Sequence, residues 1–200
     1  MSESLLFHDG NRSLQDAFHS RRIADRLEEL SRTAFADSDR SFIESSIYFF
    51  LATSDPSGQP DVSFKGGPPG FVRVTGPDEL AFPDYDGNGM FKSLGNLTVH
   101  PKVGLLFIAM HGAPRRLRVS GEASISRDDP LLGETVGAQM IVRVKARAIF
   151  PNCPRYIPKL ALVEPSPYVP IAGQDFVEPG WKSSETYREH VHPRAPTFRG

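Results

Sequence analysis

Short β-type segments follow one another from Tyr48 to Phe150, and this succession constrains the fold more than any other feature of the chain. Two of the segments, RRLRVSGEASI and AQMIVRVKARAIF, alternate apolar and polar residues, so each should have one buried and one exposed face. Turn-forming residues separate the segments, as in the Asp55-Pro56-Ser57-Gly58 stretch between two apolar runs. Such a pattern is typical of an antiparallel sandwich or barrel. The sequence therefore predicts a mainly β fold with flanking helices.

Helical spacing of apolar residues predicts three helices around and within this β region. The first covers residues 13–30, with Ser13 as its cap, and the second is a short helix over residues 39–46. The third covers NGMFKSLGNLTVH at residues 88–100, where Asn88 can cap the first turn.

A change in composition along the chain suggests three parts. Residues 1–40 are expected to form a helical extension, and residues 41–150 the β domain. Residues 151–200 are rich in proline and irregular, so we expect an extended arm that packs on the barrel or on a partner subunit.

Composition excludes several classes of function. The formal net charge of −1 gives no global attraction to nucleic acid, and the longest apolar runs are far shorter than a membrane helix, so neither partner is expected. Cys153 is the single cysteine and the first residues carry no signal-peptide pattern, which together predict a cytoplasmic protein. His190 and His192 have no cysteine or carboxylate partners nearby, so no metal site is expected.

The segment DYDGNGMFKS has the outline of a phosphate site. The glycines on either side of Asn88 leave backbone amides accessible at a helix start, where Lys92 and Ser93 add a cation and a hydroxyl. The alternative is an ordinary capped surface helix whose lysine is only solvated.

A second cluster of polar residues lies earlier in the chain. Ser63 and Lys65 are expected to share one face of a strand, with Phe64 pointing the other way. The alternative is the solvent face of an edge strand. If this strand adjoins the helix start, two lysines, two serines and an asparagine converge on one anion. The basic run PRRLRV is either a solvated strand face or a second anion contact.

The order of these segments resembles the flavin-binding split-barrel family related to pyridoxamine 5'-phosphate oxidase, in its uncharacterised flavin-nucleotide-binding branch. The resemblance covers roughly residues 42–150 and rests on FFLATSDPSGQPDVSFKGG, ELAFPDYDGNGMFKSLGNLTVHPKVGLLFI and RRLRVSGEASI. It implies a six-stranded antiparallel split β-barrel that forms a homodimer, with FMN bound in clefts between the subunits. The cofactor-binding residues that it implies are Ser63, Lys65, Pro83, Asp84, Asn88, Lys92 and Ser93, with Arg116 or Arg118 contributed by the other subunit.

The resemblance implies hydride transfer at flavin N5 to or from a small-molecule substrate, and it identifies no catalytic residue. Two alternatives remain open: a non-catalytic flavin-binding module for storage or sensing, and a protein of the same fold that uses deazaflavin or haem. The arm after residue 150 does not match the substrate-binding tail of the oxidase, so vitamin B6 synthesis is not expected. The segment Cys153-Pro154-Arg155-Tyr156 is instead hypothesised to close over the cofactor.

Overall fold

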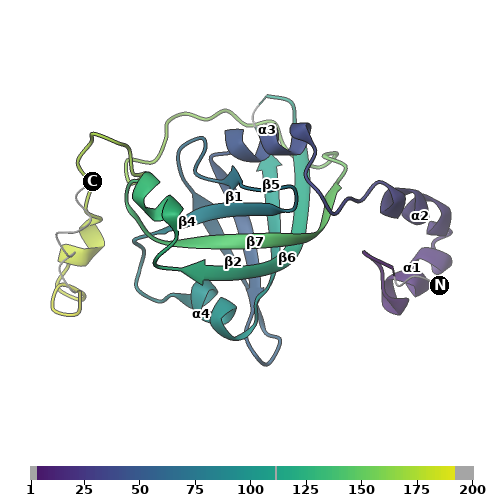
Figure 1. Ribbon diagram of the computed structural model, residues 1–200, viewed down its shortest axis with the longest axis horizontal. Coiled ribbons are helices and arrows are strands. Elements are labelled where there is room, and N and C mark those ends of the chain that lie inside the picture. The colour runs from purple at the N-terminus through teal and green to yellow at the C-terminus, as the bar shows by residue number, and fades with distance from the viewer. Residues whose placement is uncertain (1–3, 111, 192–200) are drawn as a thin grey trace.

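A single antiparallel sheet of seven strands, curled into a barrel, forms the body of the protein (Figure 1). The computed structural model describes residues 4–110 and 112–191. The strand order is β2-β1-β5-β6-β7-β4-β3. The predicted mainly β fold is confirmed, with seven strands in place of six; one of the seven, within the expected GFVRV segment, has only two residues. The strands are β1 Tyr48–Ser54, β2 Pro60–Gly66, β3 Arg73–Val74, β4 Glu79–Tyr85, β5 Lys102–Ala109, β6 Arg115–Ser126 and β7 Ala138–Pro151.

The hairpin between β1 and β2 forms where the turn residues predict it. The amide of Gly58 donates to the carbonyl of Asp55, and Asp55 Oδ1 accepts from the amides of Ser57 and Gln59. Gly58 has a φ of 87°, which favours glycine over other residues at this position. The turn fixes the register in which β2 pairs with β1.

Aromatic side chains fill the interior of the barrel. Phe49 is fully buried, and its ring centroid lies 4.9 Å from that of Phe82, 5.1 Å from that of Phe107 and 6.0 Å from that of Phe71. These residues come from three strands and one loop, so a single cluster ties the curled sheet together. Edge-to-face and offset pairs of this kind add to the stabilisation from buried area.

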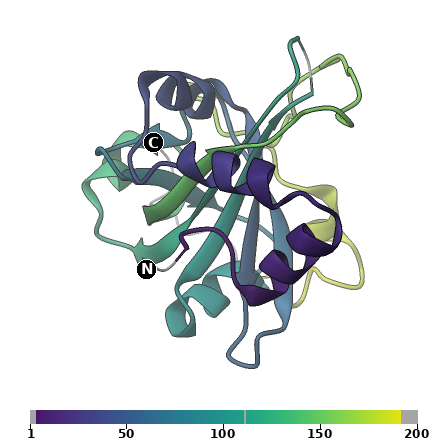
Figure 2. The same cartoon turned by 90° about the vertical axis from the view of Figure 1, so that its right-hand side faces the viewer.

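The N-terminal region contains two helices in place of the single predicted helix over 13–30. Helix α1 is Asp9–Ala17, capped by His8 and not by Ser13, and helix α2 is Arg21–Glu29. The break occurs because His19 adopts a φ of 53°, outside the helical range. Figures 1 and 2 show this pair of helices standing out from one end of the barrel.

The remaining helices flank the sheet. Helix α3 begins two residues earlier than expected, and helix α4 four residues later. No helix in the described part of the chain is both long enough and apolar enough to cross a bilayer. The elements are α3 Asp37–Ser45, α4 Lys92–Val99 and the 3-10 turns η1 Pro130–Glu134 and η2 Gly180–Ser183.

Candidate functional site

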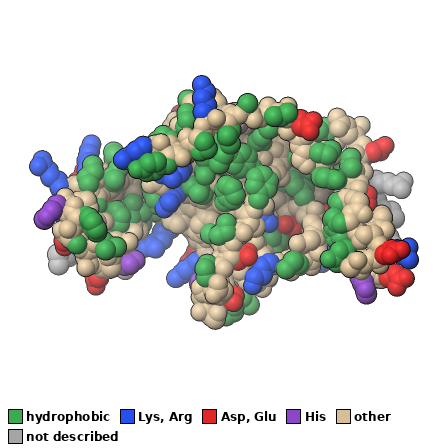
Figure 3. Space-filling model, turned by 180° about the vertical axis from the view of Figure 1, so that it is seen from behind, with side chains coloured by type: hydrophobic (Ala, Val, Ile, Leu, Met, Phe, Trp, Pro, Cys, Tyr) green, Lys and Arg blue, Asp and Glu red, His purple; other side chains and the backbone are tan. Residues whose placement is uncertain are grey.

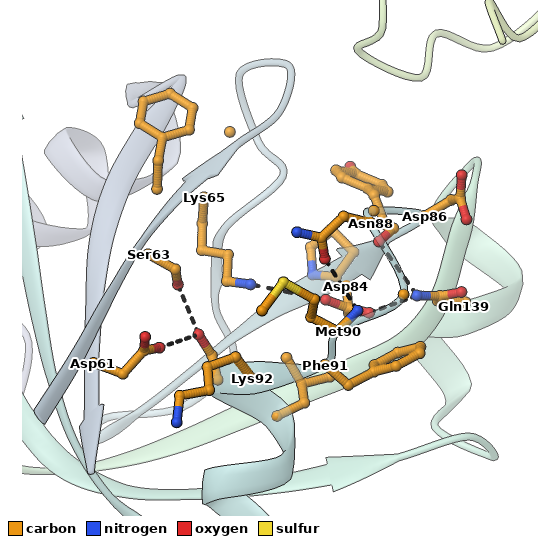
Figure 4. Close-up of a pocket in the computed structure, with 18 of the residues that line it drawn as sticks. Asp61, Ser63, Lys65, Asp84, Asp86, Asn88, Met90, Phe91, Lys92 and Gln139 are labelled. Carbon is orange, nitrogen blue, oxygen red and sulfur yellow. Dashed lines mark hydrogen bonds and ion pairs between the residues drawn. The ribbon is translucent and has the colours of Figure 1, made fainter. Parts of the chain in front are cut away.

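A cavity of about 600 Å³ opens at the gap between the two ends of the curled sheet (Figure 4). Strand β2 is one edge of the sheet, and β4 lies next to the opposite edge. The curl brings these two strands to the same cavity although no β-ladder joins them. The lining comes from β2, Phe71 in the loop before β3, the end of β4 with the loop that follows it, the first turn of α4, and Gln139 of β7.

Strand β2 points alternate side chains into this cavity. Asp61, Ser63 and Lys65 are half-buried there, whereas Val62 and Phe64 are 65% and 62% exposed; the strand alternation puts both on the other face, although Phe64 also borders the cavity. The predicted common face of Ser63 and Lys65 is therefore present, and it does not point into open solvent. Asp61 belongs to the same face and was missed, although the two-residue alternation that relates Ser63 to Lys65 extends to it.

The start of α4 differs from the prediction. The helix begins at Lys92, because Phe91 has a φ of 47° and cannot continue a helical turn backwards. Asn88 does not cap it: its Oδ1 accepts from the amide of Met90, at 3.1 Å, within the preceding loop. Lys92 and Ser93 are consequently the first two helical residues, where backbone amides lack intrahelical acceptors.

Ser93 joins the two candidate segments directly. Its hydroxyl donates to Asp61 Oδ2 at 3.1 Å and lies 3.0 Å from Ser63 Oγ. The strand carrying Ser63 and Lys65 and the helix start carrying Lys92 and Ser93 therefore adjoin. Two cations and two hydroxyls border one end of the cavity, together with one carboxylate that the sequence reading did not include.

Asp84 lies buried on the β4 side of the cavity. Its Oδ2 accepts from Gln139 Nε2 at 2.7 Å, and its Oδ1 lies 3.9 Å from Lys65 Nζ (Figure 4). The register of β4 on β7 shifts between Asp84, which pairs with Met140, and Tyr85, which pairs with Ala138. Gln139 therefore has no paired residue on β4. Burial raises the pKa of Asp84, and the contacts of Gln139 and Lys65 partly offset this effect.

The loop after β4 is held from outside by the C-terminal arm. Asp86 forms an ion pair with Lys182, a largely buried side chain that also contacts Glu178 at 2.8 Å. Burial raises the pKa of the neighbouring Tyr85 to about 12, so its hydroxyl stays protonated near neutral pH. The arm therefore positions part of the cavity wall, a role that no sequence pattern indicated.

Apolar side chains complete the wall. Pro83, one of the predicted site residues, lies beside Asp84 at the end of β4. Met90 and Phe91 lie in the loop before α4, where they are 71% and 49% exposed. The cavity thus has one end with charged and hydroxyl groups and walls with apolar character.

Arg116 and Arg118 do not reach this cavity within one subunit. Cross-strand pairing aligns Phe64, Phe50, Leu106 and Arg118 in one row on the outer side of the sheet, and Tyr48, Ile108 and Arg116 fall in the next row. Paired residues share a face. We call the apolar part of these rows, together with Val62 of the adjacent row, the outer face; its residues are Tyr48, Phe50, Val62, Phe64, Leu106 and Ile108. Figure 3 shows hydrophobic side chains gathered across the middle of the molecule seen from behind.

The arm segment beginning at Cys153 lies near the outer face. Arg116 Nη2 donates to the carbonyl of Cys153 at 2.6 Å, and no residue of the segment Cys153-Pro154-Arg155-Tyr156 lines the cavity of the same subunit. The described residues contain no cluster of three or more side chains suited to bind a metal, and His192 lies outside them.

Comparisons with solved structures give distant similarities. An FMN-binding protein from Syntrophomonas wolfei is 17% identical, with 70% of this chain and 97% of that chain covered and a TM-score of 0.46. HupZ from Group A Streptococcus is 15% identical, with 58% and 94% covered and a TM-score of 0.45. HutZ, a heme storage protein from Vibrio cholerae, is 18% identical, with 56% and 86% covered and a TM-score of 0.38. No functional conclusion follows from similarity at this level.

The family comparison is more decisive. No curated protein matches the chain in sequence. The family model described as pyridoxamine 5'-phosphate oxidase matches residues 35–167, which is more than half of the chain and includes every strand and the whole cavity lining. By its sequence and its antiparallel barrel, this chain belongs to the pyridoxamine 5'-phosphate oxidase family.

Proposed function

We propose that this protein is an FMN-binding oxidoreductase that acts on a small molecule. The observation that carries the proposal is the convergence of Lys65, Lys92, Ser63 and Ser93 at one end of the cavity, in a chain of this family. Ammonium and hydroxyl donors beside the first amides of a helix suit a phosphate group.

The residues present fit FMN in size and in the distribution of donors. A volume of about 600 Å³ lies within the usual range for small-molecule sites. Lys65, Lys92, Ser63 and Ser93 would hold the phosphate, and the apolar wall beside Pro83 would face the isoalloxazine ring. Asp61 and Asp84 oppose a bound anion, so the fit depends on how these two carboxyl groups are neutralised.

Bound flavin would supply hydride transfer at N5, and the chain would supply binding, orientation and exclusion of water. Asp84 and Gln139 lie where they can hydrogen-bond the edge of a ring placed beside Pro83. A non-catalytic flavin-binding module would use the same contacts, so only turnover separates the two functions.

We also propose that the protein acts as a homodimer in which the outer face is covered by a second subunit. Val62 and Phe64 are each more than 60% exposed, and Phe64 continues a row with Phe50 and Leu106 across three strands. Contiguous apolar surface of this kind favours a protein partner. Arg116 and Arg118 border the outer face, from which they would reach the cavity of the partner subunit. A cytoplasmic location stays a prediction from the single cysteine.

The absorption spectrum of the purified protein, with and without added FMN, tests the cofactor. We expect the two-band flavin spectrum and a fixed FMN stoichiometry on titration. A single sharp Soret band after purification would show that the cofactor is haem and not FMN. Absence of flavin binding would refute the proposal.

Anaerobic addition of a nicotinamide cofactor then tests the activity. We expect bleaching of the flavin bands as the bound flavin is reduced, followed by recovery of these bands in air. A flavin that stays oxidised with both nicotinamide cofactors contradicts nicotinamide-driven turnover and favours the binding module.

A further inference from the structure

We propose that Asp84 is the positioning residue that couples ligand charge to protonation in this cavity: it holds Lys65 before an anionic ligand binds, and it takes up a proton when the ligand draws Lys65 away. The inference rests on the proposed phosphate site. The role of Asp84 follows from its carboxyl group and from the register shift between β4 and β7 that aims this group into the cavity.

Lys65 lies near Asp84 and on the strand face that adjoins the start of α4. Its ammonium lies 3.9 Å from Asp84 Oδ1, a separation that gives attraction without a direct hydrogen bond. Ser63, two residues earlier on the same face of β2, lies 3.0 Å from Ser93 at the start of α4. An anion at the helix start would therefore compete with Asp84 for the same ammonium group, and a phosphate carries more charge than one carboxylate.

The register shift between β4 and β7 fixes Asp84 in this position. Gln139 has no partner on β4, and its side chain donates to Asp84 Oδ2. Bulges of this kind re-aim side chains and are common beside functional sites. The Asp84 side chain is 11% exposed, so water is a poor replacement for Lys65 as a source of stabilisation.

The groups that face Asp84 favour protonation once Lys65 moves. Lys65 comes from β2 and Gln139 from β7, while Asp86 lies in the loop that follows β4 and repels the carboxylate. Lys182 of the arm pairs with Asp86 and weakens that repulsion. Burial already raises the pKa of Asp84, and losing the attraction of Lys65 raises this pKa further.

The charge balance of the cavity leads to the same conclusion. Lys65 and Lys92 supply two positive charges, Asp61 and Asp84 two negative charges, and Asp86 is paired with Lys182. A phosphate monoester brings about −1.5 to −2 at neutral pH. Uptake of one proton by Asp84 removes one of the opposing charges, so binding of FMN should weaken as the pH rises.

Calorimetric titration with FMN in buffers of different ionisation enthalpy measures the number of protons taken up on binding. At pH 7.5 we expect wild-type protein to take up more protons than Asp84→Asn, by up to one proton per site. Riboflavin, which lacks the phosphate, should show no difference between the two proteins. The ionisation of the FMN phosphate itself is common to both proteins and cancels in the comparison.

Equal proton uptake by wild type and Asp84→Asn would overturn the inference. Asp61→Asn is the matched control, because it removes the other cavity carboxylate; loss of the effect in this variant instead would transfer the role to Asp61 and refute the assignment to Asp84. If wild-type protein shows neither heat nor a spectral change with FMN, the proposed function itself fails, and the inference fails with it.

A measurement on the wild type alone covers the case in which the variant does not fold. The carboxyl carbon resonance of Asp84 should titrate at a higher pH in the FMN complex than in the ligand-free protein. An unchanged midpoint would refute the inference even though FMN binds.

Discussion

Replacing Lys65 by methionine should weaken FMN binding and leave riboflavin binding unchanged. The substitution removes the ammonium group but keeps most of the apolar length of the side chain. Lys65 is 20% exposed, so its contact with a phosphate would be largely screened from water.

The size of the effect follows from this environment. A hydrogen bond to a charged group contributes about 1.5–3 kcal/mol. Part of that gain is offset because Lys65 must leave Asp84, 3.9 Å away, so the lower half of the range applies. Each 1.4 kcal/mol corresponds to a factor of ten, and the Kd for FMN should therefore rise roughly 10- to 40-fold.

Quenching of flavin fluorescence, titrated with FMN and with riboflavin, measures both constants on the same samples. Lys102→Met is the matched control: Lys102 is exposed on β5 and lies outside the cavity lining. Equal weakening of both ligands by Lys65→Met would show a general loss of structure. No change for either ligand would show that Lys65 does not contact the phosphate, and the phosphate site would be wrong.

Three further substitutions test the assembly and the fold. Phe64→Asp should convert a dimer to a monomer in light scattering, because it puts a charge on the outer face; a variant that stays dimeric would place the interface elsewhere. Gly121→Ala should destabilise the barrel by roughly 3 kcal/mol in urea unfolding, since the added Cβ would lie 2.1 Å from the carbonyl oxygen of Lys145; a stability close to wild type would refute this. The Arg143 guanidinium lowers the pKa of Asp129 below 3.8, so the pair stabilises the fold above this value and the gain is lost as the pH falls below it. Asp129→Asn should therefore have a lower Tm than wild type at pH 7, and the two Tm values should converge as the pH falls below 3.8; a constant difference would contradict the assignment.

The strands could be predicted because their signals are local. Two-residue alternation and turn chemistry such as Asp55 to Gly58 are properties of neighbouring residues. The helix boundaries were less predictable, because His19 and Phe91 have positive φ values that their own preferences do not indicate. The backbone conformation of Phe91 depends on the surrounding fold and stops the helix from starting earlier. The helix predicted from the apolar pattern therefore began four residues too early, at Asn88 and not at Lys92.

The cavity residues divide in the same way. The convergence of Ser63 and Lys65 with Lys92 and Ser93 could be anticipated from polar groups on a strand face and at a helix start. Gln139 could not be found, because its contact with Asp84 depends on a register shift between two strands about 55 positions apart. Arg116 and Arg118 do not line the cavity of their own subunit, and their assignment to the site stays a prediction that depends on the proposed homodimer.

The gap in the sheet has a mechanical consequence. Within the described sheet β2 pairs with β1 alone, and its further hydrogen bonds are those of the Ser93 side chain, so it is the long strand most easily detached from the barrel. A ligand gripped by Lys65 of β2 and by the end of β4 acts as a cross-link between strands that share no ladder. Removal of the ligand should loosen the β1–β2 hairpin first and leave β5, β6 and β7 rigid. The rate of hydrogen exchange at the amides of β2 should therefore report whether the cavity is filled.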